Sequence, residues 1–327
     1  MIQDISLRTT VPDVSNKEAT RLPAMEPSVG AGRLPSWNLT KARHRPCPVC
    51  NHDDSELICY RPDELPVARC IQCEMIYLPE IPDPREVSAF YEKYGDFKGL
   101  GLEVLSRPKL AKARLTDRHV AILLNSGGLK GSTLIDVGCS HGRFLQMARY
   151  CGANVIGIEI DKAACASLQQ LNIQNYQDLS VCRPADVVCA FQLLEHLEMP
   201  QEFCSEVCNA LTEDGRLLLA LPNGGEVEQI GESWVGFRVD LEHFNYFSLK
   251  TLARLLGRYN LFIEQFWFHS QPNIPRSSSP FLGRSATAPI LRRILGRTLG
   301  YPGHNEIAGG GSFVLTVLAR KICSKPR

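Results

Sequence analysis

The sequence lacks a net charge of either sign. Its 327 residues contain 36 Lys and Arg against 35 Asp and Glu, which gives a formal net charge of +1. A chain this close to neutrality has no global field that attracts nucleic acid or an anionic membrane. Long apolar runs are missing too, since no stretch approaches the roughly 20 apolar residues that a membrane-spanning helix needs. We therefore expect no membrane span.

The first 43 residues lack the apolar core of a secretory signal peptide. They carry proline, serine, asparagine and scattered charges instead, a composition typical of a flexible tail. Without a signal, the thirteen cysteines of the chain indicate reduced thiols rather than a disulfide framework, with some of them bound to metal. We expect a cytoplasmic protein.

Four cysteines form two C-x-x-C pairs, Cys47 with Cys50 and Cys70 with Cys73. Each pair can supply two thiolates from one tight turn, and the loop between the pairs can bring the turns together. Four thiolates close a tetrahedral coordination sphere. The pattern therefore predicts a structural zinc ribbon over 44–80 rather than a catalytic metal. Unrelated core cysteines and a redox pair are weaker alternatives, and two neighbouring histidines could substitute as ligands, namely His44 and His52.

A second strong pattern lies at 134–142. The apolar run 134–137 contains Asp136 and leads into the turn Gly-Cys-Ser-His-Gly at 138–142, and a second apolar run ends at Glu159. Glycines at a strand-to-helix turn let a ligand approach the backbone. A carboxylate about 20 residues later is placed to accept hydrogen bonds from a ribose diol. The pattern predicts a nucleotide-type site.

Spacing separates the interpretations of this turn. A dinucleotide fingerprint needs G-x-G-x-x-G, whereas the small residues here fall at 138, 140 and 142. The same letters spell the G-x-S-x-G elbow of a serine hydrolase, with Ser140 as nucleophile, but no His-Gly-Gly stretch precedes it and it follows the first strand of its domain. An S-adenosylmethionine turn, with Ser140 replacing the middle glycine, alone explains both Asp136 and Glu159. A plain turn without ligand is the remaining alternative.

From about Gly131 to Lys321 the chain resembles the class I S-adenosylmethionine-dependent methyltransferases, in the group that includes the ubiquinone-type O-methyltransferases. The turn at 136–142 resembles the family's first motif. The segment 191–200, FQLLEHLEMP, resembles its LEH-x-x-x-P element, and 211–223, LTEDGRLLLALPN, resembles its L-x-x-G-G-x-L-x-x-x-x-P-N element. Asp214 replaces the first glycine of that last turn. The elements at 75–79 and at 90–94, FYEKY, are similar to a zinc ribbon found ahead of such enzymes, and the aromatics there either pack in the core or face substrate.

The resemblance implies S-adenosyl-L-methionine as cofactor, with Glu159 on its ribose and Asp178 on its adenine side. The implied cofactor-binding residues are Asp136, Gly138, Ser140, Gly142, Glu159, Asp178, Phe191 and Gln192. His196 and His243 fall in segments that border the acceptor pocket in that family. They are the candidate bases for deprotonating an acceptor hydroxyl, with Glu195 as a third candidate catalytic residue.

Gln192, Glu195 and His196 would share one helical face if the turn after the fourth strand were helical. Ubiquinone-type and small-RNA terminal methyltransferases carry E-x-x-E-H there and are associated with a divalent metal. Gln192 removes one hard anionic ligand, which weakens a magnesium-type site. We therefore expect Glu195 and His196 to fix the turn by hydrogen bonds, with a second metal as the alternative.

Short apolar strands alternate with helices over 128–327, which predicts an α/β fold: a doubly wound, mostly parallel, Rossmann-like seven-stranded sheet, preceded by the zinc ribbon. The expected strands are 133–137, 155–159, 173–176, 186–191, 216–221, 261–268 and 312–320, and the resemblance makes the last two an antiparallel edge. A helical connector is expected at 81–127, with one helix over 103–124. The stretch 271–311 is expected to be a lid or a disordered insertion.

We expect a methyltransferase that acts on a small-molecule acceptor, such as a sugar, a lipid, a quinone-like compound or a secondary metabolite, and by family habit an O-methyltransferase. The first alternative is an RNA methyltransferase whose zinc ribbon binds substrate. Against it, segment 47–73 carries only Arg61 and Arg69 as cations among five acids, a poor footprint for phosphate. An inactive cofactor-binding regulatory domain and the serine hydrolase are further alternatives.

Overall fold

The computed structural model describes residues 19–23, 35–92, 100–182, 184–269 and 313–322. The stretch expected to be a lid or insertion, 271–311, lies outside these residues, as does most of the tail expected over 1–43. In the part that is described, no helix is both long and apolar enough to cross a membrane.

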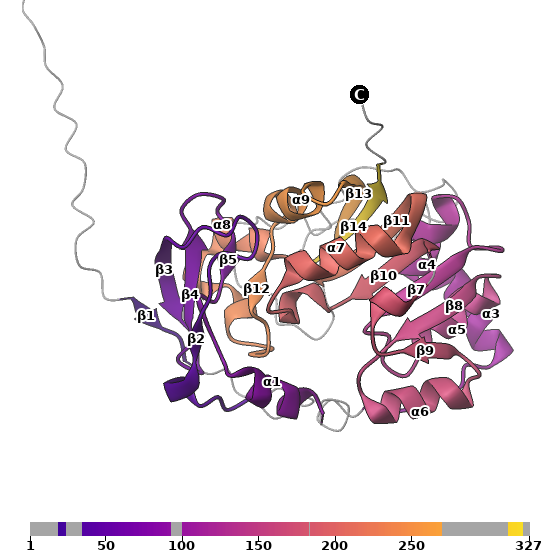
Figure 1. The fold of residues 1–327 in the computed structure, drawn as a ribbon, viewed down its shortest axis with the longest axis horizontal. Helices are drawn as coiled ribbons and strands as arrows, with labels where there is room; N and C mark the ends of the chain where they lie inside the picture. Colours follow the sequence, from indigo (N-terminus) through magenta and orange to yellow (C-terminus); the bar gives the residue numbers. More distant parts are fainter. Residues whose placement is uncertain (1–18, 24–34, 93–99, 183, 270–312, 323–327) are drawn as a thin grey trace, which may run out of the picture.

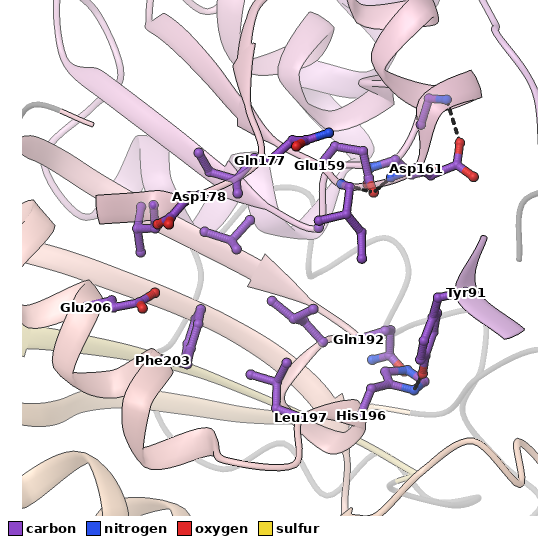
Figure 2. A pocket seen from close by; sticks show the side chains of 18 of the residues that line it. Tyr91, Glu159, Asp161, Gln177, Asp178, Gln192, His196, Leu197, Phe203 and Glu206 are labelled. Atoms are coloured by element: carbon purple, nitrogen blue, oxygen red, sulfur yellow. Dashed lines mark hydrogen bonds between the residues drawn. The ribbon is translucent and has the colours of Figure 1, made fainter. Parts of the chain in front are cut away.

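The largest element is a seven-stranded sheet in the order β13-β14-β11-β10-β7-β8-β9 (Figure 1). Its strands are β7 (Thr133–Val137), β8 (Asn154–Ile158), β9 (Gln174–Tyr176), β10 (Ala185–Phe191), β11 (Leu211–Pro222), β13 (Leu261–His269) and β14 (Val314–Lys321). The strands from β9 to β11 pair in parallel, and β14 runs antiparallel to both of its neighbours. The predicted fold class is confirmed. A cavity opens at the carboxyl ends of β7, β8 and β10 (Figure 2).

Helices cover both faces of this sheet. They are α3 (Arg107–Thr116), α4 (Arg118–Asn125), α5 (Arg143–Tyr150), α6 (Lys162–Gln170), α7 (Pro200–Ala210) and α9 (Leu249–Gly257). Two further helices are α1 (Pro84–Tyr91) and α8 (Val227–Ile230). Short 3-10 turns are η1 (Leu39–Lys41), η2 (Leu179–Val181), η3 (Leu194–His196), η4 (Gly224–Glu226), η5 (Gly231–Ser233) and η6 (Val235–Phe237).

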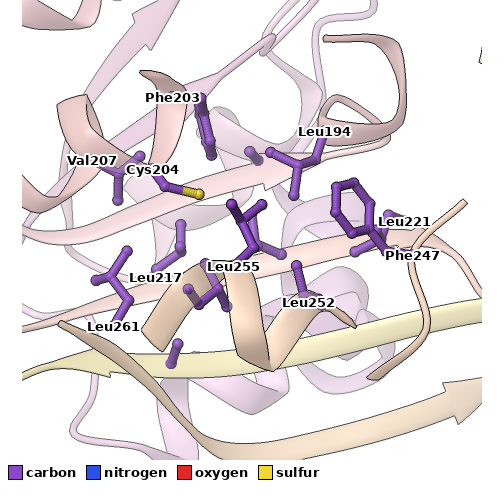
Figure 3. Packing of buried hydrophobic residues seen from close by; sticks show 14 of the residues in the cluster. Leu194, Phe203, Cys204, Val207, Leu217, Leu221, Phe247, Leu252, Leu255 and Leu261 are labelled. Carbon is purple, nitrogen blue, oxygen red and sulfur yellow. The ribbon is translucent and has the colours of Figure 1, made fainter. Parts of the chain in front are cut away.

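The two faces of β11 show why the sheet is doubly wound. Leu217, Leu219 and Leu221 join one buried cluster with α7 and α9 (Figure 3), while Leu218 joins a second cluster with α4, α5 and α6. Successive side chains of a strand point to opposite faces, so the continuous apolar run 217–221 must be buried by other elements on both faces of the sheet. The helices supply both covers.

The prediction of a single helix over 103–124 is wrong. The structure has two helices, α3 and α4, because Asp117 adopts an extended conformation between them (φ −77°, ψ 126°). Its carboxylate accepts a hydrogen bond from the Val120 backbone N–H at 3.0 Å. Aspartate competes for backbone donors in this way at the first turn of a helix, so it starts α4 rather than continuing α3.

A second, five-stranded sheet has the order β1-β3-β4-β5-β12. Its strands are β1 (Thr20–Arg21), β3 (Ser55–Tyr60), β4 (Pro66–Cys70), β5 (Ile76–Tyr77) and β12 (Asn245–Tyr246), and nearby β2 (Arg43–His44) pairs with β6 (Glu80–Ile81). We call residues 35–92 the ribbon segment. Figure 1 shows β12, in orange, beside its indigo strands, and β12 pairs antiparallel with β5. The ribbon segment therefore shares a sheet with the chain around residue 245, although the predicted domain boundaries themselves stay predictions.

Gly224, two residues after the end of β11, gives a test of this junction. A Cβ there would lie 2.3 Å from the carbonyl oxygen of Tyr246 in β12, whereas a Cβ on Gly257 meets nothing within 4 Å. We expect Gly224→Ala to lower the free energy of unfolding by about 1–3 kcal/mol through overpacking against backbone. Gly257→Ala, the matched control at the end of α9, should be neutral or stabilise by about 0.5–1 kcal/mol. Urea denaturation measures both; equal effects of the two variants would contradict the close approach.

Candidate functional site

The cavity has a volume of about 670 Å³ and joins two differently built ends. At one end lie the turn after β7 and the residues that follow β8 and β9. At the other end lies the segment after β10, covered by Tyr91 of α1 (Figure 2). Its polar lining consists of Tyr91, Ser140, His141, Glu159, Asp161, Gln177, Asp178, Gln192, His196, Glu198, Glu202 and Glu206.

The turn after β7 has a left-handed backbone at Gly138 (φ +73°), Ser140 (φ +48°) and Gly142 (φ +76°). At Gly142 a Cβ would lie 2.6 Å from a methyl group of Leu168. Only glycine therefore lets α5 start so close to α6. Ser140 adopts a conformation that a non-glycine residue rarely takes, which fits its place where the resembled family has glycine.

Glu159 ties this turn to the end of β8. Its carboxylate accepts hydrogen bonds from three backbone N–H groups, those of Ser140 (2.8 Å), Ile160 (2.8 Å) and Asp161 (2.9 Å). Glu159 also lines the cavity. Each carboxylate oxygen has more than one acceptor position, so these bonds leave capacity for a ribose hydroxyl. The ribose contact itself stays a prediction.

The eight predicted cofactor residues divide into two groups. Gly138, Ser140, Glu159, Asp178 and Gln192 line the cavity, whereas Asp136, Gly142 and Phe191 are not among its lining residues. Asp136 is 2% exposed, and burial, with a contribution from Glu159, raises the pKa of its carboxyl well above the ordinary value. Phe191 stacks on His119 with ring centroids 4.2 Å apart. These three lie beneath the cavity rather than on its wall.

The serine-hydrolase alternative requires a histidine on Ser140. Among the residues that the structure describes, no histidine hydrogen-bonds to the Ser140 hydroxyl, and the adjacent His141 places Nδ1 2.7 Å from Oγ of Ser167 instead. A nucleophilic serine needs such a base within hydrogen-bond reach. The geometry gives that alternative no support.

The helical face expected for Gln192, Glu195 and His196 is wrong. Gln192 has a left-handed backbone (φ +52°) and precedes η3, so it lies outside the helical turn. Its backbone N–H donates to the Ala220 carbonyl at 2.7 Å. Gln192 is therefore placed by the end of β10, and it is not part of the turn that carries Glu195 and His196.

Glu195 differs most from its predicted role. It is fully buried, and neither of its carboxylate oxygens has a hydrogen-bond partner in the described part of the chain. The expectation that Glu195 fixes the turn by side-chain hydrogen bonds is therefore wrong. Burial raises the pKa of this carboxyl well above its ordinary range, because water no longer stabilises the charged form.

Three predicted catalytic residues come together here. Ligand atoms of Glu195, His196 and His243 lie within 4.8 Å of one another, a donor set that could hold a cation. The imidazole rings of His196 and His243 are 4.5 Å apart between centroids. Burial, reinforced by His243, lowers the pKa of His196 to about 3, so His196 is neutral at pH 7.

Sequence reasoning missed Tyr91 as a neighbour of His196. Its hydroxyl oxygen lies 2.7 Å from His196 Nδ1, and the two rings meet edge to face. The aromatic pattern at 90–94 gave the only signal, and that pattern did not distinguish core packing from a place in the site.

The four predicted zinc ligands are brought together. Their sulfur atoms lie within 4.8 Å of one another, with Cys47 and Cys73 3.4 Å apart and Cys50 and Cys70 3.5 Å apart. Hydrogen bonding from Cys47 lowers the pKa of Cys73 to about 5, which makes a thiolate available. Four clustered sulfur donors, three of them buried, fit the tetrahedral preference of Zn²⁺.

Basic residues on and just after α9 face both cysteine turns. Arg258 donates to the carbonyl of Val49, Arg254 donates to the carbonyl of Gln72 at 3.4 Å, and Lys250 pairs with Glu74. A metal bound by four thiolates carries net negative charge, and cations close to the two turns offset it.

Residues 109–265 match the family described as a methyltransferase domain. The ubiquinone biosynthesis O-methyltransferase of Acinetobacter baumannii (strain AYE) is 32% identical over 103 residues, which cover 28% of this chain and 43% of that protein. The same enzyme of Nitrosococcus oceani is 24% identical over 160 residues, which cover 43% of this chain and 63% of that protein. The chain thus spans less than two thirds of the length of these relatives.

Solved structures with a similar fold include two methyltransferases. The magnesium protoporphyrin IX methyltransferase from Synechocystis, with bound S-adenosylhomocysteine, gives a TM-score of 0.47 at 17% identity, covering 73% of this chain and 100% of that chain. The 1,6-didemethyltoxoflavin-N1-methyltransferase of Burkholderia thailandensis gives a TM-score of 0.46 at 13% identity. The match covers 78% of this chain and 99% of that chain.

The sequence match covers the turn after β7, the segment after β10 and β11, which are the places where the resembled motifs stand. The sheet carries these motifs at its carboxyl edge, in the order in which the chain presents them. Residues 109–265 are therefore a methyltransferase domain of the class I S-adenosylmethionine-dependent type.

Proposed function

We propose that this protein transfers a methyl group from S-adenosylmethionine to a hydroxyl of a small, uncharged or cationic acceptor that binds beside His196. The observation that carries the proposal is that one cavity connects the turn at Gly138 and Ser140 with the histidine end. When bound, S-adenosylmethionine supplies the activated methyl group. The residues of the chain then have to position the acceptor and take up its proton.

The cofactor end fits its proposed ligand. Gly138 and Ser140 leave the backbone open to close approach, and Glu159 and Asp178 offer carboxylates at the edge of the sheet. The carboxylates suit a donor that carries positive charge on sulfur and on its amino group. We assign Glu159 to the ribose and Asp178 to the adenine side, as the family resemblance implies.

The charge of the lining argues against an anionic acceptor. Among the described residues of the lining there are six carboxylates and no Lys or Arg. Arg43 pairs with one of the six, Glu198, at 2.8 Å. A phosphate-bearing acceptor, RNA included, would meet repulsion there, whereas an uncharged or cationic molecule would not. This argument favours a small molecule over the RNA alternative.

The state of His196 favours an acidic hydroxyl on the acceptor. A base whose pKa is near 3 takes a proton from an alkyl alcohol only at a large free-energy cost. A phenol or an enol is more acidic by several pKa units, so the same transfer costs less. The acceptor class that fits best is therefore phenolic or enolic, which includes quinol-like compounds.

We also propose that the four cysteines bind one structural Zn²⁺, because the four sulfurs surround one point and leave no coordination position for a substrate. The function of such a site is to hold two turns together, and here both turns face the basic residues of α9 and its C-terminal end.

A labelled-methyl assay tests the enzymatic proposal. The full chain is incubated with methyl-labelled S-adenosylmethionine and a panel of phenols, enols and alkyl alcohols, and we expect label in the phenols or enols. Ser140→Gly should keep most of the transfer, because the serine hydroxyl has no part in it. Ser140→Ala should be modestly worse, since the backbone there is left-handed.

Two results would count against this assignment. Label that appears only in RNA or in phosphate-bearing acceptors would favour the RNA alternative. Covalent labelling of Ser140 by a fluorophosphonate, or esterase activity that Ser140→Gly abolishes, would restore the hydrolase alternative.

Glu159 provides a test of the cofactor end. We expect Glu159→Ala to weaken S-adenosylmethionine binding by about 1–3 kcal/mol, because a charged hydrogen-bond acceptor is lost. Calorimetric titration measures the effect, with Glu56→Ala on the exposed edge of β3 as the control. Unchanged affinity in Glu159→Ala would move the ribose contact elsewhere.

Zinc binding is tested separately. Protein purified under reducing conditions should contain one zinc per chain, and Cys47→Ser or Cys70→Ser should lose the metal and fold poorly, since binding and local folding are coupled. Cys151→Ser, outside the cluster, should keep its zinc. Elemental analysis that finds no zinc in the wild type would refute the site.

A further inference from the structure

The ribbon segment reaches the acceptor end of the cavity through Arg61, which follows β3. Its guanidinium donates to the carbonyl oxygens of His243 at 2.6 Å and of Leu241 at 2.7 Å, and to the hydroxyl of Tyr246 at 2.9 Å. The remaining donors go to Asp63, whose side chain is 5% exposed. Arg61 thus fixes the backbone that presents His243.

This contact is built into the protein interior. Arg61 is 2% exposed, and a buried guanidinium is tolerated only when its charge is paired and its N–H groups are bonded. Asp63 supplies the charge, and two backbone carbonyls and a hydroxyl accept the other hydrogen bonds. The planar fork of arginine matches this set, and the point charge of a lysine would not.

A second contact reaches His196 from α1. Nδ1 of His196 lies 2.7 Å from the Tyr91 hydroxyl and 3.3 Å from the Glu242 carbonyl oxygen. A tyrosine hydroxyl can donate or accept, whereas a carbonyl oxygen can only accept, so the Glu242 contact favours the tautomer of the neutral ring with its proton on Nδ1. In that tautomer the Tyr91 oxygen accepts as well, and the lone pair of His196 is on Nε2.

We propose that the ribbon segment is the positioning part of the acceptor site. Tyr91 holds the His196 ring against the Glu242 carbonyl, which favours the Nδ1–H tautomer and leaves Nε2 as proton acceptor, and Arg61 holds the backbone of His243. The proposal rests on the proposed function only in calling Nε2 the proton acceptor. It makes the cysteine-bearing segment a scaffold for catalytic geometry rather than a binding surface for substrate.

The proposal also separates the two ends of the cavity. The contacts of Glu159 come from the turns after β7 and β8, which contain no residue of the ribbon segment. Tyr91 and Arg61 act on the opposite end. Changes in these two residues should therefore alter the histidines and the rate of methyl transfer while cofactor affinity stays the same.

The test is the tautomer of His196, read from two-bond ¹H–¹⁵N spectra of the full chain labelled with ¹⁵N-histidine and saturated with S-adenosylhomocysteine. His196→Gln assigns the resonance. We expect a single Nδ1–H tautomer in the wild type. We expect a mixture in Tyr91→Phe, because this variant keeps the phenyl ring but loses the oxygen that holds the imidazole against the Glu242 carbonyl. Tyr150→Phe, at the exposed end of α5, is the matched control and should leave the tautomer unchanged.

Kinetics and a second variant complete the test. With the phenolic or enolic acceptor found in the methyl-transfer assay, Tyr91→Phe should lower kcat at least about 10-fold, which is part of the roughly 10²–10⁴-fold that a positioned general base contributes. KM for S-adenosylmethionine should stay unchanged. Arg61→Lys should shift the His243 resonances, and Arg21→Lys, an exposed arginine of β1, should not. If Arg61→Lys fails to fold, the tautomer of His196 and the kcat of Tyr91→Phe decide the test.

The outcomes distinguish the two proposals. An Nε2–H tautomer in the wild type, or an unchanged tautomer in Tyr91→Phe, overturns the positioning role even if methyl transfer is robust. The expected tautomers without transfer to any acceptor would support the positioning role and would instead refute the proposed function.

Discussion

The histidine end of the cavity, where we propose that the acceptor binds, depends on two buried arginines of the ribbon segment. Arg45 donates to the carbonyls of Leu78, Glu198 and Phe244 at 2.8–2.9 Å, and Arg61 donates to those of Leu241 and His243. Burial lowers the pKa of Arg45 to about 10, so it stays charged at neutral pH. A buried cation that lost these acceptors would be destabilised by several kcal/mol. The loops around residues 198 and 243 are therefore held in one place by groups far away in sequence.

The cofactor side depends on the sheet alone. Strand order reverses between β7 and β10, and in doubly wound sheets this switch point is where the loops diverge and leave room for a ligand. Glu159 then joins two of those loops through backbone N–H groups. The cavity thus combines an end that any such sheet provides with an end that the ribbon segment completes through Tyr91 and Arg61. In the proposed function the first end holds the cofactor and the second holds the acceptor, so the chemistry requires both.

The sequence alone predicted the features that come from a repeating pattern or from a fixed residue spacing. Alternating strands and helices predicted the sheet, because β-strands in a doubly wound fold are short and continuously apolar. The two C-x-x-C pairs predicted a cluster that the structure assembles. The break at Asp117 and the left-handed Gln192 were missed, since each is one residue whose local hydrogen bond outweighs the pattern around it. Tyr91 and His196 are 105 residues apart and Arg61 and His243 are 182 apart, and no local pattern encodes such pairs.

Burial has opposite effects on the pKa values of two groups next to the proposed acceptor position. It raises the pKa of Glu195 well above its ordinary range, and it lowers the pKa of His196 to about 3, so His196 is neutral near pH 7. Among the carboxylates of the cavity lining, Glu159 and Asp178 lie at the proposed cofactor end and Glu206 lies on α7. In the proposed reaction the sulfonium gives its methyl group to the acceptor oxygen, and the proton of that oxygen passes to neutral His196. The positive charge therefore moves from sulfur to the imidazole and is not removed. Burial disfavours the charged imidazole, because it lowers the pKa of His196. The carboxylates of the cavity lining act in the opposite direction, since they attract the positive charge at both positions.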